Sequence, residues 1–155
     1  MNALIEDYLR ARGVQYFRGH HDDEYFFLVD FGVEFLVDAG HGRLHVHLSV
    51  SGLLRDTVHL SITPDRFYPA DDRDRLLSMA ARWTANGQGA EAVVHDSSNP
   101  ALVGISVEDR FRPTDNEGLA RCVDQTIASA IELFEQVTVE MMPDRQAPEI
   151  LRDAG

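Results

Sequence analysis

The sequence is poor in cysteine, in basic residues and in long apolar runs, and each shortage excludes a class of protein. Cys122 is the only cysteine among 155 residues, so neither an internal disulfide nor a cysteine-based zinc cluster can form. No stretch approaches the roughly 20 apolar residues that cross a bilayer, and the first residues do not resemble a secretory leader. We therefore expect a cytoplasmic protein.

The shortage of basic residues bears on possible partners. The chain has 14 lysine and arginine residues against 26 aspartate and glutamate residues, which gives a net charge of -12. Such a charge repels the phosphates of nucleic acids and of anionic membrane surfaces. We expect neither as a partner, whereas a basic or amphipathic segment of another protein would be attracted.

The sequence also lacks the motifs of common catalytic sites. It contains no glycine-rich phosphate loop, no G-x-S-x-G, no H-E-x-x-H and no acidic pair with the spacing of a glycoside hydrolase. Cys122 lies on the apolar face of a predicted helix, where a free cysteine usually serves as a buried packing residue. We therefore expect no catalytic residue and no cofactor.

The stretch from Glu24 to Thr63 contains aromatic and β-branched residues between short polar turns, a pattern typical of an antiparallel sheet. Clean alternation at 43–50 and 57–63 predicts two strands with one solvated face. Their inward residues are Leu44, Val46, Leu48, Val50, Val58, Leu60 and Ile62. The strand at 25–31 is apolar on both faces, so we expect it to be central or covered twice.

Other strands and the helices follow from similar patterns. The remaining predicted strands cover 14–18, 33–37, 90–95 and 102–109, and the turn at 39–42 should close a hairpin. Apolar residues at helical spacing predict helices over 2–12, from 70–72 to 86, and from about 114 to 141. Asn2 and Gly13 should cap the first helix, and Thr114 with Glu117 forms a capping-box pattern.

The predicted order is helix, four or five strands, helix, two strands and a long helix, since 14–18 carries the weakest strand signal. Sequential strands can all pair as hairpins, which favours an α+β fold with an antiparallel sheet and helices packed on it. We expect residues 1–142 to form a single domain. Residues 143–155, with Pro143 and Pro148, should form a flexible tail.

Three histidines are the strongest candidates for a metal site. His45 and His47 lie two apart on one strand face, and the following hairpin would bring His59 opposite or diagonal to His47. Adjacent cross-strand residues are about 4.5–5.5 Å apart, which is within reach of a shared zinc ion. The alternative, which we prefer, is that all three are solvated histidines on the wet face of the sheet.

Two other groups of residues admit a structural and a functional interpretation. His20, His21, Asp22, Asp23 and Glu24 form a dense polar cluster, which we interpret as a hairpin turn and not an ion site, because consecutive side chains diverge. Phe67, Tyr68 and Trp83 are expected in the core, with an interface as the alternative.

The segment ITPDRFYPADDRDRLLSMAARWTANGQGAEAVV (62–94), the strand pair through 103–107 and the closing helix at 119–134 resemble the type III secretion chaperone-like fold, particularly its YbjN-like branch. The resemblance covers roughly residues 2–141. It implies a non-enzymatic, dimeric module that binds peptide segments or partner proteins as a chaperone or regulator. That family is not known by catalytic residues, so it transfers none to this chain.

Three functional hypotheses therefore stand. The first is the protein-binding module, with a homodimer and no pocket expected. The second is a small metal-dependent enzyme that uses His45, His47 and His59 and holds zinc. The third is a small-molecule binder with a cavity enclosed between the sheet and the long helix, which the two apolar faces of the strand at 25–31 suggest.

Overall fold

The computed structural model describes residues 1–21, 23–32, 41–87 and 89–141, which form a seven-stranded antiparallel sheet and three α-helices. In chain order the elements are α1 (Asn2–Arg12), β1 (Tyr16–Arg18), β2 (Glu24–Gly32), β3 (His41–Ser51), β4 (Thr57–Pro64), β5 (Tyr68–Pro69), the short 3-10 helix η2 (Ala70–Asp72), α2 (Arg73–Asn86), β6 (Glu91–Asp96), β7 (Leu102–Phe111) and α3 (Asn116–Met141). The predicted α+β class with an antiparallel sheet is confirmed.

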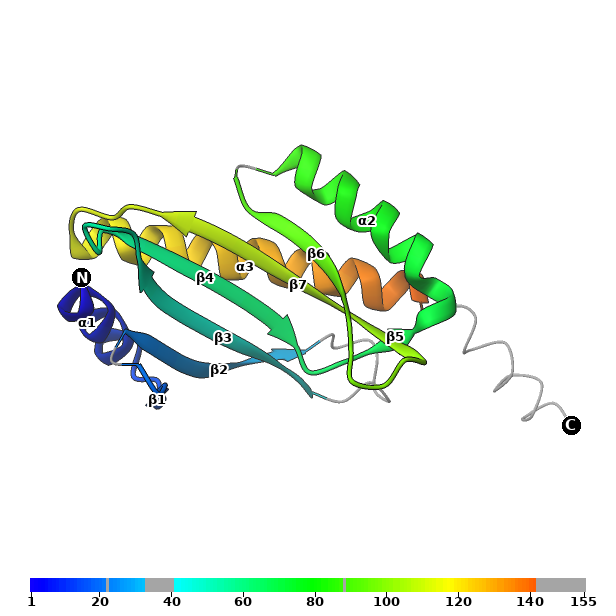
Figure 1. Ribbon diagram of the computed structural model, residues 1–155, viewed down its shortest axis with the longest axis horizontal. Helices are drawn as coiled ribbons and strands as arrows, with labels where there is room; N and C mark the ends of the chain where they lie inside the picture. Colours follow the sequence, from blue (N-terminus) through cyan, green and yellow to red (C-terminus); the bar gives the residue numbers. More distant parts are fainter. Residues whose placement is uncertain (22, 33–40, 88, 142–155) are drawn as a thin grey trace, which may run out of the picture.

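The sheet is built from sequential hairpins except where β7 inserts (Figure 1). Strands β1 to β4 follow one another, and β4 then pairs with the end of β7 while the short β5 pairs with its start. Val107 of β7 pairs with both Ile62 of β4 and Ala92 of β6, so β4 and β6 occupy opposite edges of β7. The strand β6 is thus the last of the sheet on that side.

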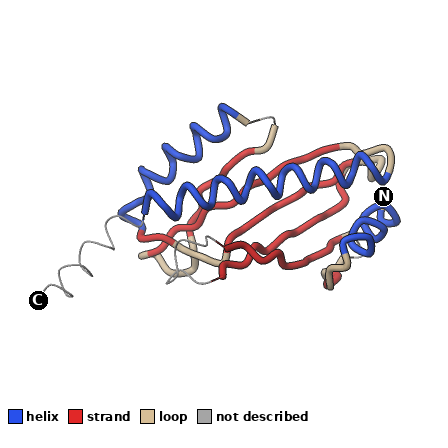
Figure 2. Tube along the Cα trace, turned by 180° about the vertical axis from the view of Figure 1, so that it is seen from behind, coloured by secondary structure: helices blue, strands red, loops and turns tan. Residues whose placement is uncertain are grey.

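The core lies between the sheet and the helices α1 and α3. Figure 2 shows α3 running along one face of the sheet, with α1 beside its first turns. The inner residues predicted for β3 and β4 are all buried, and Tyr25 joins Leu48 and Leu60 in one cross-strand row that is fully buried. Helix α3 contributes Leu119, Val123, Leu133, Phe134 and Val137.

The strand β2 pairs with β1 and β3 on its two edges, so it lies inside the sheet, but it is covered on one face only and the alternative of double coverage is wrong. It is second from the β1 edge, and its residues Tyr25 and Phe27 are buried against the helices. Phe26 and Leu28 point to the other face, where 41% and 43% of their surface is exposed. The helices pack against one face of the sheet, which leaves the second apolar set of β2 in contact with solvent.

The helix ends agree only in part with the predicted caps. Gly13 takes the left-handed conformation, with a φ of 65°, as predicted for the C-cap of α1. The N-cap of α1 is Met1 and not Asn2, because Asn2 is already helical. At α3 the carboxylate of Asp115 accepts a hydrogen bond from the backbone N–H of Gly118 at 2.7 Å, so Asp115 and not Thr114 caps this helix.

Several predicted features lie wholly or partly outside the described residues. They are the strand at 33–37, most of the turn at 39–42 and the tail at 143–155. The weak strand at 14–18 is present as β1, shortened to three residues. Among the described helices, none is long and apolar enough to cross a membrane.

Candidate functional site

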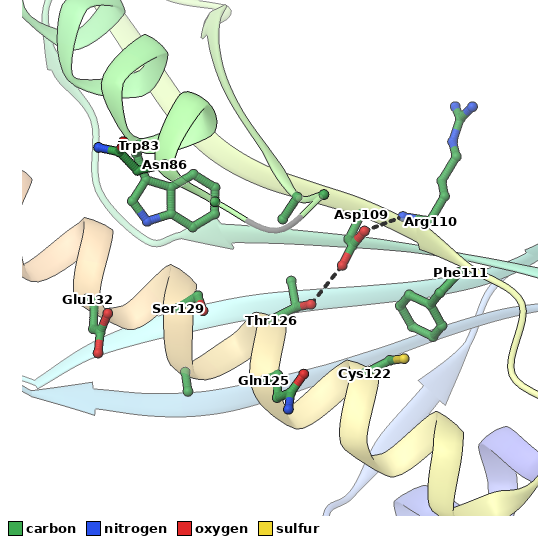
Figure 3. A pocket seen from close by; sticks show the side chains of 14 residues that line it. Trp83, Asn86, Asp109, Arg110, Phe111, Cys122, Gln125, Thr126, Ser129 and Glu132 are labelled. Atoms are coloured by element: carbon green, nitrogen blue, oxygen red, sulfur yellow. Dashed lines mark hydrogen bonds between the residues drawn. The ribbon is translucent and has the colours of Figure 1, made fainter.

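A cleft of about 730 Å³ opens between the helices α2 and α3, over the adjoining strands β6 and β7 (Figure 3). Its lining includes Trp83 from α2, Ala90 just before β6, Asp109 and Phe111 from β7, and Thr126 and Glu132 from α3. The α3 residues that line it run from Cys122 to Glu132 with a spacing that places them on one side of the helix. The hypothesis of a binding module without a pocket therefore needs correction on this point.

Asp109 points into the cleft because it lies on the face of β7 that is turned toward the helices. Val103, Ile105 and Val107 lie on that face and are buried, whereas Asp109 stands where the strand passes beyond the core. Its carboxylate accepts a hydrogen bond from the hydroxyl of Thr126 at 2.8 Å and another from the backbone N–H of Arg110 at 2.8 Å. These bonds fix the carboxylate in the cleft wall.

Two aromatic side chains mark the two ends of the cleft. Figure 3 shows Trp83 near Glu132 and Ser129 at one end, and Phe111 near Cys122 at the other. Arg110 also borders the cleft, but its guanidinium extends away from it (Figure 3), because Arg110 pairs with His59 on the opposite face of the sheet. The cleft therefore combines apolar ends with acidic and uncharged polar groups.

The three candidate histidines lie on the outer face of the sheet, opposite to the face that adjoins this cleft. His47 pairs with Ser61 and His59 pairs with Ser49, so His59 is diagonal to His47, one of the two predicted arrangements. Each histidine stands beside a carboxylate through its Nε2 atom, at 4.0 Å for His45 and Asp65, 3.9 Å for His47 and Glu24, and 3.6 Å for His59 and Glu108.

No group of three metal-ligating side chains with the geometry of a metal site occurs within the described residues. The histidines are instead divided among three separate carboxylate partners. A shared zinc ion on His45, His47 and His59 stays an untested hypothesis.

His47 has the most altered surroundings of the three histidines. Its ring stacks on Phe26 with centroids 4.5 Å apart, and its Nε2 atom is buried without a hydrogen-bond partner. Burial lowers the pKa of His47 below its ordinary value, the charge of Glu24 opposes this shift, and nearby His59 adds to it. At neutral pH the ring is therefore uncharged.

Beside His47 the outer face carries an apolar patch, formed by Phe17, Phe26 and Leu28 and here named the outer patch. Phe17 and Phe26 are direct cross-strand partners, and 70% of the surface of Phe17 is exposed. Leu28 lies two residues along β2 on the same face. No described helix covers these side chains, so the outer patch is a second candidate for an interaction surface.

The remaining candidates fall into different environments. His20 and His21 are exposed in the turn before β2, as predicted, while Asp23 pairs with Arg55; Asp22 lies outside the described residues. Tyr68 is buried, as expected for the core, but Phe67 is exposed and Trp83 lines the cleft.

Cys122 also lines the cleft and is only half-buried, so its prediction as a buried packing residue is wrong. The buried stripe of α3 passes through its neighbour Val123. One residue corresponds to about 100° around a helix, which turns Cys122 toward the cleft.

Of the cleft residues, only Trp83 and Cys122 were singled out by the sequence, both first as core residues, and one further signal was present. Asp109 is an acidic residue in phase with three buried aliphatic residues, and a carboxylate in such a position needs partners or solvent. The approach of α2 to α3, which creates the cleft, depends on tertiary packing and leaves no local pattern.

An antiparallel sheet with α3 along one face and α2 beside β6 defines a YbjN-like α+β fold. In the comparison with solved structures, the chain matches YbjN from E. coli, described as a candidate transcription regulator, with a TM-score of 0.61. The match covers 90% of this chain and 92% of that chain at 11% sequence identity, so it is a likeness of fold. No family model and no curated protein matches the sequence.

Proposed function

We propose that this chain is a non-enzymatic module that binds a segment of a partner protein in the cleft between α2 and α3. The observation that carries the proposal is the open cleft of about 730 Å³ with aromatic side chains at both ends and polar groups between them. Aromatic anchors beside polar groups are typical of sites that recognise short protein segments. The YbjN-like fold is compatible with such a regulatory or chaperone-like role.

A cavity of this volume also falls within the range of small-molecule pockets. The third hypothesis expected a cavity enclosed between the sheet and the long helix, and the apolar strand at 25–31 suggested it; the inward side chains of that strand, Tyr25 and Phe27, are buried in the core. The observed cleft is at the β7 side of the sheet and is open along α3. This arrangement favours an elongated occupant over an enclosed small molecule.

The test is a selection of random heptapeptides against the immobilised chain, followed by affinity measurement by fluorescence polarisation. Ala128→Trp fills the cleft from an exposed position of α3, and we expect it to weaken binding of the selected peptides by about tenfold, as loss of one anchor contact does. Ala81→Trp, at an exposed position of α2 outside the cleft, is the matched control and should bind as the unaltered chain does. Equal binding by both variants, or no selected peptide at all, would contradict the proposal.

We propose further that the chain forms a homodimer through the outer patch, with residues 1–142 acting as a single cytoplasmic domain. A chain with a net charge of -12 repels its own copies, so self-association favours an apolar surface over a charged one. Phe17, Phe26 and Leu28 provide an uncharged surface at the β1 edge of the sheet.

A further inference from the structure

We propose that the cleft between α2 and α3 selects a basic amphipathic segment, with a lysine or arginine side chain between Asp109 and Glu132 and apolar side chains at the two aromatic ends. This inference rests on the proposed function and adds the chemistry of the partner. Four observations support it: the sign of the charge in the cleft, the orientation of α2, the position of the aromatic rings and the length of the cleft.

The ionised side chains that face the cleft are both acidic. Asp109 stands in its wall and Glu132 at its rim, whereas the guanidinium of the neighbouring Arg110 extends away from it (Figure 3). Asp109 already accepts hydrogen bonds from Thr126 and from the backbone of Arg110, yet a carboxylate has about four acceptor positions, so it retains capacity for a bound cation. The cleft thus attracts a positive group and disfavours an acidic one.

The helix α2 adds to this negative potential. It ends at Asn86, and Trp83, Asn86 and Gly87 from its last turn line the cleft. The carbonyl groups at the end of a helix carry a partial negative charge of roughly half an electron, which favours cations nearby. The potential therefore has two independent sources, the carboxylates and the helix end.

The aromatic rings define where the apolar side chains of the segment bind. Trp83 and Phe111 lie at opposite ends of the cleft, and Asp109 lies between them (Figure 3). Either ring can also accept the face of a guanidinium group, and Trp is the best side chain for this contact. The order along the cleft is apolar, acidic, apolar, which is complementary to an amphipathic segment with a central basic residue.

The length of the cleft limits the size of the segment. Its wall on α3 runs from Cys122 to Glu132, and ten residues of helix extend roughly 15 Å at 1.5 Å per residue. An extended chain covers about 3.3 Å per residue, so some five residues fill the cleft. A short linear segment is thus sufficient.

The experiment uses the fluorescence of Trp83, which is the only tryptophan of the chain and lies in the cleft. The full chain is titrated with three blocked heptapeptides that alternate leucine with arginine, with glutamine or with glutamate. We expect the arginine peptide to shift the emission and to bind at least tenfold more tightly than the glutamine peptide, with an affinity that falls as salt is raised. The glutamate peptide should cause no change.

Variants then assign the charge preference to the cleft. Glu132→Gln should weaken the arginine peptide about fivefold, as expected for loss of one partly exposed ion pair, and leave the glutamine peptide unaffected. Asp109→Asn should act in the same direction while keeping an acceptor for Thr126. Glu140→Gln removes an exposed carboxylate from α3 outside the cleft and is the matched control.

The outcomes separate the inference from the proposed function. Equal binding of the arginine and glutamine peptides, with loss of both in Ala128→Trp, would overturn the charge preference and keep the segment-binding cleft. Spermidine that shifts the emission as strongly as the arginine peptide would overturn the inference in favour of a small-cation site. A failure of all three peptides to bind would contradict both the inference and the proposed function.

Discussion

At the residue scale, the imidazole of His47 makes the stability of the folded chain depend on pH. Burial lowers the pKa of His47 in the folded chain, whereas in the unfolded chain it has the ordinary value of about 6.5. Between these two pKa values the unfolded chain therefore binds a proton at His47 that the folded chain does not. The stability that comes from neutral His47 is therefore complete above this window and is lost as the pH falls through it. We expect the free energy of unfolding, measured in urea between pH 8 and pH 5, to fall less steeply in His47→Gln.

The contribution of His47 to this change in the free energy of unfolding should stay below about 1 kcal/mol, because its ring is partly exposed. His20→Gln, which alters an exposed histidine in a turn, is the control and should follow the unaltered chain. NMR titration gives a second readout: Glu24→Gln should lower the pKa of His47 further, and His59→Asn should raise it. A pKa of His47 above the ordinary histidine value would refute the assignment.

Individual residues also show how far the sequence could be interpreted. Strict alternation in β3 and β4 was sufficient to place His45, His47 and His59 on one face, but it left His59 either opposite or diagonal to His47. The register of the hairpin decides for the diagonal position. Asp109 was predicted only as part of a strand. Its role as a cleft residue depends on where β7 emerges from the core, which the alternation alone does not specify.

At the element scale, the contact between α1 and α3 includes a partly buried polar link. The hydroxyl of Tyr8 donates a hydrogen bond of 2.7 Å to Asp124, which also pairs with Arg12, and burial with this bond raises the pKa of Tyr8. Tyr8→Phe removes a hydrogen bond to a charged group, and we expect a loss of about 1–2 kcal/mol in the free energy of unfolding. Urea denaturation at pH 7 measures it.

Tyr16→Phe removes a hydroxyl from a half-buried tyrosine outside this link and serves as the control. The pair Tyr8→Phe and Asp124→Asn should be less than additive, since both changes interrupt the same hydrogen bond. Strict additivity in this double-mutant cycle would show that the two side chains do not interact.

The positions of the helices and strands along the chain were largely predictable, whereas the face of each strand that the helices cover was not. Periodicity located α2, α3 and the two strands between them, because local spacing carries the apolar pattern of each element. Both faces of β2 are apolar, so the sequence did not indicate which of them would be buried. Only the packing of the helices against the Tyr25 face decided between them, and it left Phe26 and Leu28 exposed.

At the scale of the whole molecule, two candidate surfaces lie on different parts of the sheet. The cleft adjoins β6 and β7 at one side, and the outer patch lies at the β1 edge on the opposite face. Because these surfaces share no residue, a dimer formed through the outer patch would keep both clefts open. Partner binding and self-association can therefore be tested separately.

Phe17→Ser should dissociate the proposed homodimer. In a two-fold symmetric contact each copy loses the same side chain, and two exposed phenylalanines at about 2 kcal/mol each correspond to a roughly thousandfold weaker association. Native mass spectrometry over a range of concentrations gives the subunit number. Leu53→Ser, which alters a fully exposed leucine in the turn between β3 and β4, is the control and should remain dimeric. A monomeric unaltered chain would refute the dimer, and dissociation by Leu53→Ser alone would move the interface to that turn.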